Sequence, residues 1–241
     1  MADALDRLVG RWGALGAGFD APARAGTPDL ERLLLDTARH APRMARLFIM
    51  AATWLHEHGE MVAQHRLRRL IRDELEPEHH ATLGLLLDLA QKNTRKPEFA
   101  STLKRLTPAP DPSPLFAVEG RTPARRAMAE KRASDRSKRW GRWCAPIDLK
   151  PDALRPASWI LRRHPALRTR CDFRGDLRAS VLAALRFDPR AGESQLRLSK
   201  LAGGTRQQVL SVLDHLEKTG RVIVGPAVAD HGPPRCAVRL A

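Results

Sequence analysis

Apolar side chains recur every three or four residues between positions 28 and 106, and this spacing constrains the fold more than any other feature of the sequence. The pattern breaks at Gly59, before Pro77 and before Pro97, where helices commonly end or begin. Five helical segments result, over residues 28–41, 41–59, 60–75, 77–93 and 97–106. Because short turns join them, we predict that residues 1–106 form a helical bundle domain.

Residues 107–123 contain five prolines, a composition that suits neither a helix nor a central strand. We interpret them as a Pro-rich linker. Residues 124–171 are predicted to form a basic helical arm that connects this linker to a C-terminal domain at 172–241. The arm should begin with a helix from about Pro123 to Lys138. Its apolar residues are alanines and one methionine, so it either lies on a partner or stays solvated.

The formal net charge of +15 is concentrated in one fifth of the chain. Residues 1–120 are neutral, with 16 basic and 16 acidic side chains, whereas residues 121–170 carry 15 basic and 4 acidic ones. A uniform compositional drift toward arginine would have charged the N-terminal half as well. A basic block of this kind favours attraction to a polyanion, and nucleic acid is the commonest polyanion in a cytoplasm.

The last 70 residues follow a fixed order of predicted elements. A helix over residues 176–187 precedes a helix over about 195–202 and a third helix that begins at Thr205 and ends at Gly220. Two alternating segments, 221–228 and 236–240, then predict a two-stranded β-hairpin. The fold class expected for the chain is therefore mainly α, with an N-terminal bundle and a C-terminal three-helix domain that ends in a small hairpin.

Residues 194–220 resemble the helix-turn-helix of bacterial transcriptional regulators. The family pattern places a small residue, a turn glycine and a β-branched residue at fixed spacing, and here these are Ser199, Gly203 and Val209. With the hairpin included, the resemblance extends to the winged helix-turn-helix superfamily and covers the C-terminal third of the chain. Two residues depart from the pattern: Ser199 stands where alanine is usual, and Gly204 stands where an aliphatic residue is usual.

The third helix offers a candidate surface for reading DNA. If Val209, Leu213 and Leu216 face the core, polar residues occupy the opposite side. A recognition helix presents such residues to base edges, and glutamine can pair bidentately with adenine. The residues assigned to base readout are Gln207, Gln208, Ser211 and His215. Those assigned to phosphate contact or to the wing are Thr205, Arg206, Lys218, His231 and Arg235. The alternative is an ordinary solvated helix face.

The basic arm is a second candidate surface, this time for phosphates. Its cations are Arg125, Arg126, Lys131, Arg132, Arg136, Lys138, Arg139 and Arg142. If about six of them meet phosphates, affinity should fall by orders of magnitude as salt rises. Trp140 and Trp143 either stack on bases or anchor the arm to the C-terminal domain, and we favour anchoring.

Other site classes find little support in the sequence. No run of about 18 apolar residues predicts a membrane span, and no secretory signal is recognised. Three widely spaced cysteines argue for a reducing compartment, so a cytoplasmic location is expected. His56, His58 and His65 are close in sequence, but the break at Gly59 separates them, and we expect no metal site. No catalytic constellation and no cofactor motif are found, so we expect no enzyme.

The sequence thus predicts a double-stranded DNA-binding protein, most specifically a transcriptional regulator. It would use the C-terminal domain and the basic arm, and would form a homodimer or bind a protein partner through its N-terminal domain. Two alternatives stay open. One is a non-catalytic DNA-binding or docking subunit of a larger bacterial nucleic-acid machine, such as a phage-defence complex. The other is an RNA-binding protein that uses the arm.

Overall fold

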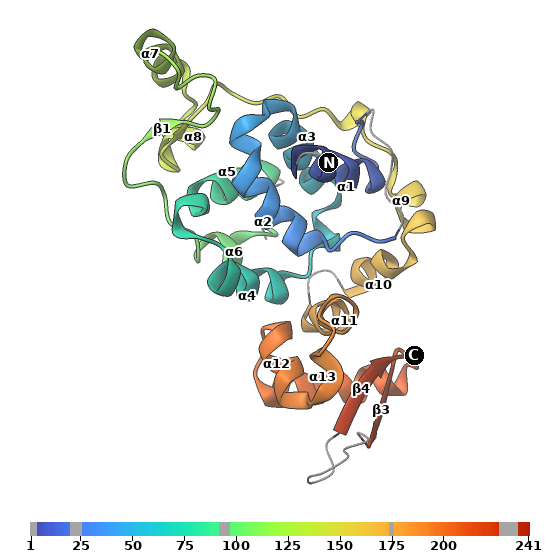
Figure 1. The fold of residues 1–241 in the computed structure, drawn as a ribbon. Coiled ribbons are helices and arrows are strands. Elements are labelled where there is room, and N and C mark those ends of the chain that lie inside the picture. Colours follow the sequence, from blue (N-terminus) through green and yellow to red (C-terminus); the bar gives the residue numbers. More distant parts are fainter. Residues whose placement is uncertain (1–3, 20–25, 92–96, 174–175, 227–235) are drawn as a thin grey trace. The chain divides into compact units, whose positions relative to one another are not determined.

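The computed structural model describes residues 4–19, 26–91, 97–173, 176–226 and 236–241 (Figure 1). It confirms a mainly helical protein with a small two-stranded sheet at the C-terminal end. The chain divides into two compact units, and each is built from two stretches of sequence. Unit 1 comprises Met1–Gly59 and Glu74–Ala166, and unit 2 comprises Glu60–Asp73 and Leu167–Ala241. No described helix is both long and apolar enough to cross a membrane.

Unit 1 is a helical bundle with a small two-stranded addition. Its helices are α1 (Ala4–Ala14), α2 (Leu30–His40), α3 (Ala45–His58), α5 (His80–Ala90), α6 (Ala100–Leu103), α7 (Pro123–Arg132), α8 (Asp135–Arg139) and α9 (Ala157–Arg163). The core contains Trp12 and Trp54, whose rings pack edge to face 5.6 Å apart. Their indole N–H groups donate to Thr37 Oγ1 and to the Leu15 carbonyl, at 2.9 and 2.8 Å. Both buried donors are therefore satisfied, as a packed interior requires.

The proline-rich segment and the basic arm belong to unit 1. Strand β1 (Ser113–Pro114) pairs in parallel with β2 (Arg142–Trp143), and the Leu115 side chain is buried. Downstream, Trp140 packs against Gly84 of α5 so closely that a Cβ added at Gly84 would overlap the indole ring. The segments predicted as a linker at 107–123 and a connector at 124–171 are thus folded onto the bundle up to Ala166.

Unit 2 contains the C-terminal elements in the expected order. They are α10 (Pro165–Phe173, which begins in unit 1), α11 (Leu177–Phe187), α12 (Gln195–Ala202), α13 (Arg206–Lys218), β3 (Val222–Pro226) and β4 (Cys236–Leu240). The two strands are antiparallel, with Val222 opposite Leu240 and Val224 opposite Val238. One apolar core joins α11, α12, α13 and the sheet.

Helix α4 (Gln64–Glu74) also packs in unit 2 except for its last residue, although the sequence placed it in the N-terminal bundle domain, 1–106. The reason lies in a buried polar contact rather than in the apolar spacing. The Arg66 side chain is fully buried, and its Nε donates to Asp188 Oδ2 at 3.2 Å. The Arg66 backbone N–H lies 3.2 Å from Ser180 Oγ of α11.

Candidate nucleic-acid interface

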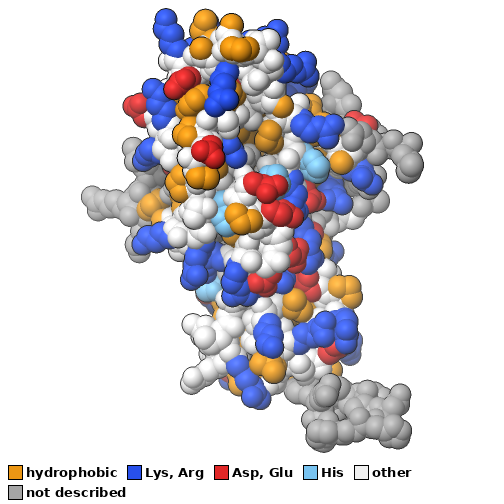
Figure 2. All heavy atoms as spheres, turned by 60° about the vertical axis from the view of Figure 1, so that its left-hand side comes forward, with side chains coloured by type: hydrophobic (Ala, Val, Ile, Leu, Met, Phe, Trp, Pro, Cys, Tyr) orange, Lys and Arg blue, Asp and Glu red, His pale blue; other side chains and the backbone are white. Residues whose placement is uncertain are grey.

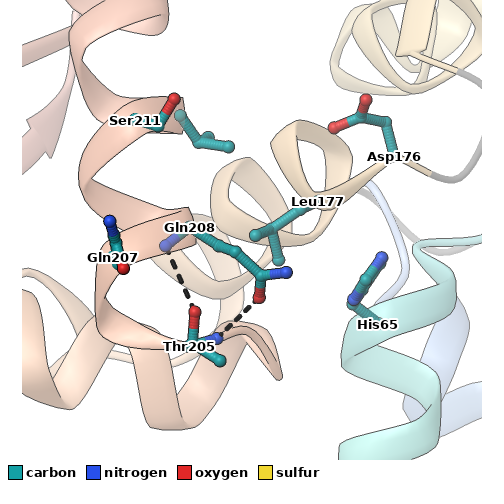
Figure 3. Close-up of a pocket in the computed structure, with 8 residues that line it drawn as sticks. His65, Asp176, Leu177, Thr205, Gln207, Gln208 and Ser211 are labelled. Carbon is teal, nitrogen blue, oxygen red and sulfur yellow. Dashed lines mark hydrogen bonds between the residues drawn. The ribbon is translucent and has the colours of Figure 1, made fainter.

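Helix α13 begins with a complete capping box. The Thr205 hydroxyl accepts the Gln208 backbone N–H at 3.2 Å, and Gln208 Oε1 accepts the Thr205 backbone N–H at 3.0 Å (Figure 3). Thr205 is therefore the N-cap that the sequence predicted, and the first turn of α13 is locally fixed. A fixed first turn holds the exposed side chains that follow it in defined positions.

The capping box changes the role of Gln208. Bidentate pairing with adenine needs both the oxygen and the nitrogen of a side-chain amide. The oxygen of Gln208 is already engaged at the start of its own helix. In this structure Gln208 caps α13, and base readout by Gln207 and Gln208 stays a prediction. The signal was present in the sequence, because Thr-x-x-Gln is a capping-box pattern.

The remaining faces of α13 follow the prediction. Val209, Leu213 and Leu216 are buried. The side chains of Gln207, Ser211, His215 and Lys218 are exposed, as are those of Thr205 and Arg206. Asp214 lies on the exposed side, but Lys218 Nζ is 2.7 Å from its Oδ2, so the carboxylate charge is locally compensated. His215 Nε2 lies 3.3 Å from Nη1 of Arg178, a residue of α11. The exposed surface of α13 is therefore continuous with that of α11.

The turn before α13 explains both departures from the family pattern. Gly203 adopts a left-handed conformation, with φ of 80°, as a turn glycine should. Ser199 is buried and its hydroxyl donates to the Leu196 carbonyl at 2.8 Å, so the extra oxygen is satisfied. At Gly204 an added Cβ would lie 2.7 Å from Leu177 Cδ2. The Leu177 side chain therefore fills the space that an aliphatic residue at 204 would need.

A groove of about 690 Å³ lies beside the first two turns of α13, within unit 2 (Figure 3). Its α13 side is formed by Thr205, Gln207, Gln208, Ser211 and Val212, and its opposite side by His65, Asp176 and Leu177. His65 belongs to α4 and Asp176 caps α11. The sequence missed both residues as neighbours of α13. Periodicity assigned α4 an apolar face but carried no information about which unit that face contacts.

The pKa values of His65 and Asp176, two titratable groups of this groove, are both lowered. Burial and the nearby Arg68 lower the pKa of His65, although the backbone of Gly203 and the carboxylate of Asp176 act in the opposite direction. Burial alone would raise the pKa of Asp176, but hydrogen bonds from the backbone and side chain of Arg178 outweigh it and lower the pKa. At neutral pH the groove therefore contains a neutral imidazole and an ionised, hydrogen-bonded carboxylate.

Three of the eight arm cations, Arg136, Arg139 and Arg142, contact polar groups of the bundle or of β1 in unit 1. Arg139 Nη2 lies 3.3 Å and Arg136 Nε 3.8 Å from Asp88, which also accepts the Trp140 indole N–H at 2.9 Å. The Arg142 side chain donates to Ser113 Oγ at 2.6 Å and to the Glu78 carbonyl at 3.1 Å. Burial lowers the pKa of Arg142. These three arginines contact the bundle or β1, although the Arg136 and Arg139 side chains stay 43% and 68% exposed, and these contacts were not foreseen.

Of the other five arm cations, one lies against a tryptophan ring and four are exposed. Arg126 lies over the Trp143 ring, with Cζ 5.7 Å from its centroid. The remaining exposed cations of the arm are Arg125, Lys131, Arg132 and Lys138. Trp140 and Trp143 do anchor the arm, but Trp140 does so on α5 of unit 1, and the expectation that they anchor it to the C-terminal domain was wrong. Phosphate contact by the four exposed cations stays a prediction.

Some predicted groups lie elsewhere. His231 and Arg235, expected at the wing, are outside the described residues. Within the described part of the chain, no three His, Cys, Asp or Glu side chains are grouped as metal ligands. Burial raises the pKa of both Cys144 and Cys171 to about 11, so these thiols are protonated at neutral pH and are poor nucleophiles.

Comparisons with known proteins give no relative for this chain: no family model matches it, and no curated protein or solved structure is significantly similar.

Proposed function

We propose that unit 2 binds double-stranded DNA, with α13 placed in the major groove. The observation that carries this proposal is the exposed side of α13. It presents Gln207, Ser211 and His215 to solvent, and its one carboxylate in the middle turns, Asp214, is paired with Lys218. Neutral hydrogen-bonding side chains at the start of a helix suit base edges, and an uncompensated carboxylate would repel the phosphates on either side.

The surroundings of α13 support the same proposal. Arg206 is exposed at the first position of the helix, where backbone N–H groups and the helix dipole favour a phosphate. The order of three helices and a two-stranded sheet resembles a winged helix-turn-helix, a fold that commonly docks in this way. Transcriptional regulation in the cytoplasm is the most specific function that we propose. In it, unit 1 would supply a dimer contact or a protein partner's site.

The proposal is tested by fluorescence anisotropy with labelled duplex DNA, duplex RNA and single-stranded DNA over a series of salt concentrations. A selection from random duplexes comes first, and the selected sequence is compared with a scrambled one. We expect the selected duplex to bind at least about 100-fold more tightly than the scrambled one at moderate salt. Absence of binding to any duplex DNA would refute the proposal. Preference for duplex RNA would favour the RNA-binding alternative.

A second candidate function, as a docking subunit of a nucleic-acid machine, is favoured by exposed apolar side chains on unit 2. Leu196 is 53% exposed, Ile223 41% and Leu210, on α13 itself, 39%. Protein contacts commonly use exposed leucine and isoleucine side chains such as these. Binding to selected and scrambled duplexes with equal, salt-sensitive affinity would support this candidate over a regulator.

A further inference from the structure

Helix α7 is folded onto unit 1 by very few of its own side chains. Of its ten residues only Ala129 is buried, while Arg126 contacts Trp143 and the Pro112 carbonyl. The N-terminus is capped by the Thr122 hydroxyl, which accepts the Arg125 backbone N–H at 3.3 Å. Helices shorter than about 12–15 residues are marginal in water unless one face is packed. The exposed side of α7 is thus well placed to gain stability from a further contact.

A small pocket of about 220 Å³ lies on this side of α7. Its lining is formed by Glu119, Arg125, Met128, Ala129, Arg132 and Ala145. We call these residues, together with the nearby Val118, the α7 surface. Met128 and Val118 are 47% and 48% exposed, and no other large hydrophobic side chain of described unit 1 is exposed to this degree. Figure 2 shows, at its top where α7 lies, hydrophobic side chains surrounded by Lys and Arg.

The composition of the α7 surface suits a protein better than a nucleic acid. Methionine and arginine are enriched at protein interfaces. Single-stranded nucleic acids need exposed aromatic faces for base stacking, and the described arm offers little of this kind. One face of Trp143 is covered by Arg126, and Trp140 is packed on Gly84. The pocket volume suits one or two amino-acid side chains.

Glu119 separates the two classes of partner more sharply. Its Oε2 atom is buried and has no hydrogen-bond partner among the described residues. A buried acceptor of this kind needs a donor. A peptide backbone offers N–H donors, whereas the phosphates and sugars of a DNA backbone offer only acceptors.

We propose that the α7 surface docks an acidic peptide segment of a partner protein. An apolar side chain of the segment would enter the pocket beside Met128. Its carboxylates would contact Arg125 and Arg132, which lie two helical turns apart on the side of α7 that lines the pocket. One of its backbone N–H groups would donate to Glu119 Oε2. This docking goes beyond the DNA binding proposed above, because it uses residues of unit 1 and none of α13.

The test is a binding measurement with defined probes and the full-length protein. The probes are a short peptide rich in glutamate with one central leucine, the same peptide with serine in place of leucine, and its lysine counterpart. We expect the acidic leucine peptide to bind at least about tenfold more tightly than either of the others. The double variant R125E/R132E and the single variant M128S should each lower the affinity for the acidic leucine peptide by at least about tenfold.

A matched control is R121E/K131E, which changes the net charge equally but alters exposed residues that do not line the pocket. It should change the affinity by less than about threefold. Circular dichroism verifies that each variant is folded. The proposal is overturned if the wild-type protein does not bind the acidic leucine peptide, or binds the serine peptide equally well. It is also overturned if duplex DNA displaces the peptide and R125E/R132E weakens DNA binding alone, since the surface would then be a phosphate contact.

Discussion

Arg66 and Asp188 form a buried ion pair although they are 122 residues apart in the sequence, with Nε and Oδ2 separated by 3.2 Å. The Arg66 side chain is completely inaccessible to solvent, and Cζ also lies 5.7 Å from the centre of the Phe187 ring. Removing two such charges from water is costly, so the pair repays its cost only while both members are present. It fixes α4 to the unit that contains α13.

Substituting Asp188 by asparagine should therefore destabilise unit 2. The change removes the carboxylate charge that lies beside the buried guanidinium of Arg66, and we expect a loss of about 3 kcal/mol in the free energy of unfolding. All five tryptophans lie in unit 1, so far-UV circular dichroism during urea unfolding should show the loss more clearly than tryptophan fluorescence does. The control is Asp214→Asn, which breaks an exposed pair with Lys218 and should cost less than about 0.5 kcal/mol. Equal effects of the two changes would contradict a structural role for the buried pair.

The turn glycine offers a second test of how α4 packs. Gly203 and Gly220 both have positive φ, of 80° and 64°. A Cβ at Gly203 would overlap the His65 carbonyl oxygen of α4, whereas a Cβ at Gly220 would meet nothing within 4 Å. Gly220→Ala should thus cost about 1 kcal/mol from backbone strain alone, and Gly203→Ala at least about 1 kcal/mol more. Thermal unfolding of both variants measures the difference. If the two losses are the same, α4 does not constrain the turn.

His65 should make the stability of unit 2 depend on pH. Its pKa is lowered by burial and by Arg68, so the folded state binds fewer protons than the unfolded state. Its contribution to stability is then complete above the unfolded value of about 6.5 and is lost as pH falls through the folded pKa. Burial also lowers the pKa of His79 in unit 1, so the wild type must be compared with His65→Gln. Urea unfolding at pH values from about 7.5 to about 5 should show a steeper loss in the wild type. Parallel curves would exclude His65 as the source.

The sequence predicted those features that depend on neighbouring residues. The N-cap at Thr205, the left-handed turn at Gly203 and the buried stripe at Val209, Leu213 and Leu216 each follow from local spacing. The placement of α4 did not follow, because its buried face includes Arg66 and Arg69 as well as leucines. Arginines in a helical stretch indicate a solvated face unless a distant carboxylate is known to meet them. Asp188 supplies that carboxylate.

The candidate interface was predictable to a similar extent. The exposed residues of α13 were identified correctly because helical periodicity separates them from the buried stripe. The groove beside them was not, since His65 and Asp176 reach it from two other helices. In the arm, net charge indicated eight available cations, but Asp88 engages Arg136 and Arg139. Charge counting along a sequence does not reveal such pairs.

Substitution of Gln207 tests DNA recognition by α13, whereas substitution of Gln208 tests the capping of that helix. Both are exposed glutamines at the start of α13, and only Gln208 has its oxygen engaged by the Thr205 backbone N–H. Gln207→Ala should leave the unfolding midpoint unchanged. It should lower the affinity for the selected DNA duplex by about tenfold, with little effect on the affinity for a scrambled one. Gln208→Ala should lower the free energy of unfolding by about 0.5–1 kcal/mol and should lower the affinity for both duplexes by the same factor. Anisotropy titrations and urea unfolding on the same preparations give both quantities. If Gln208→Ala instead alters sequence preference at unchanged stability, the capping box opens on DNA binding and Gln208 reads the base.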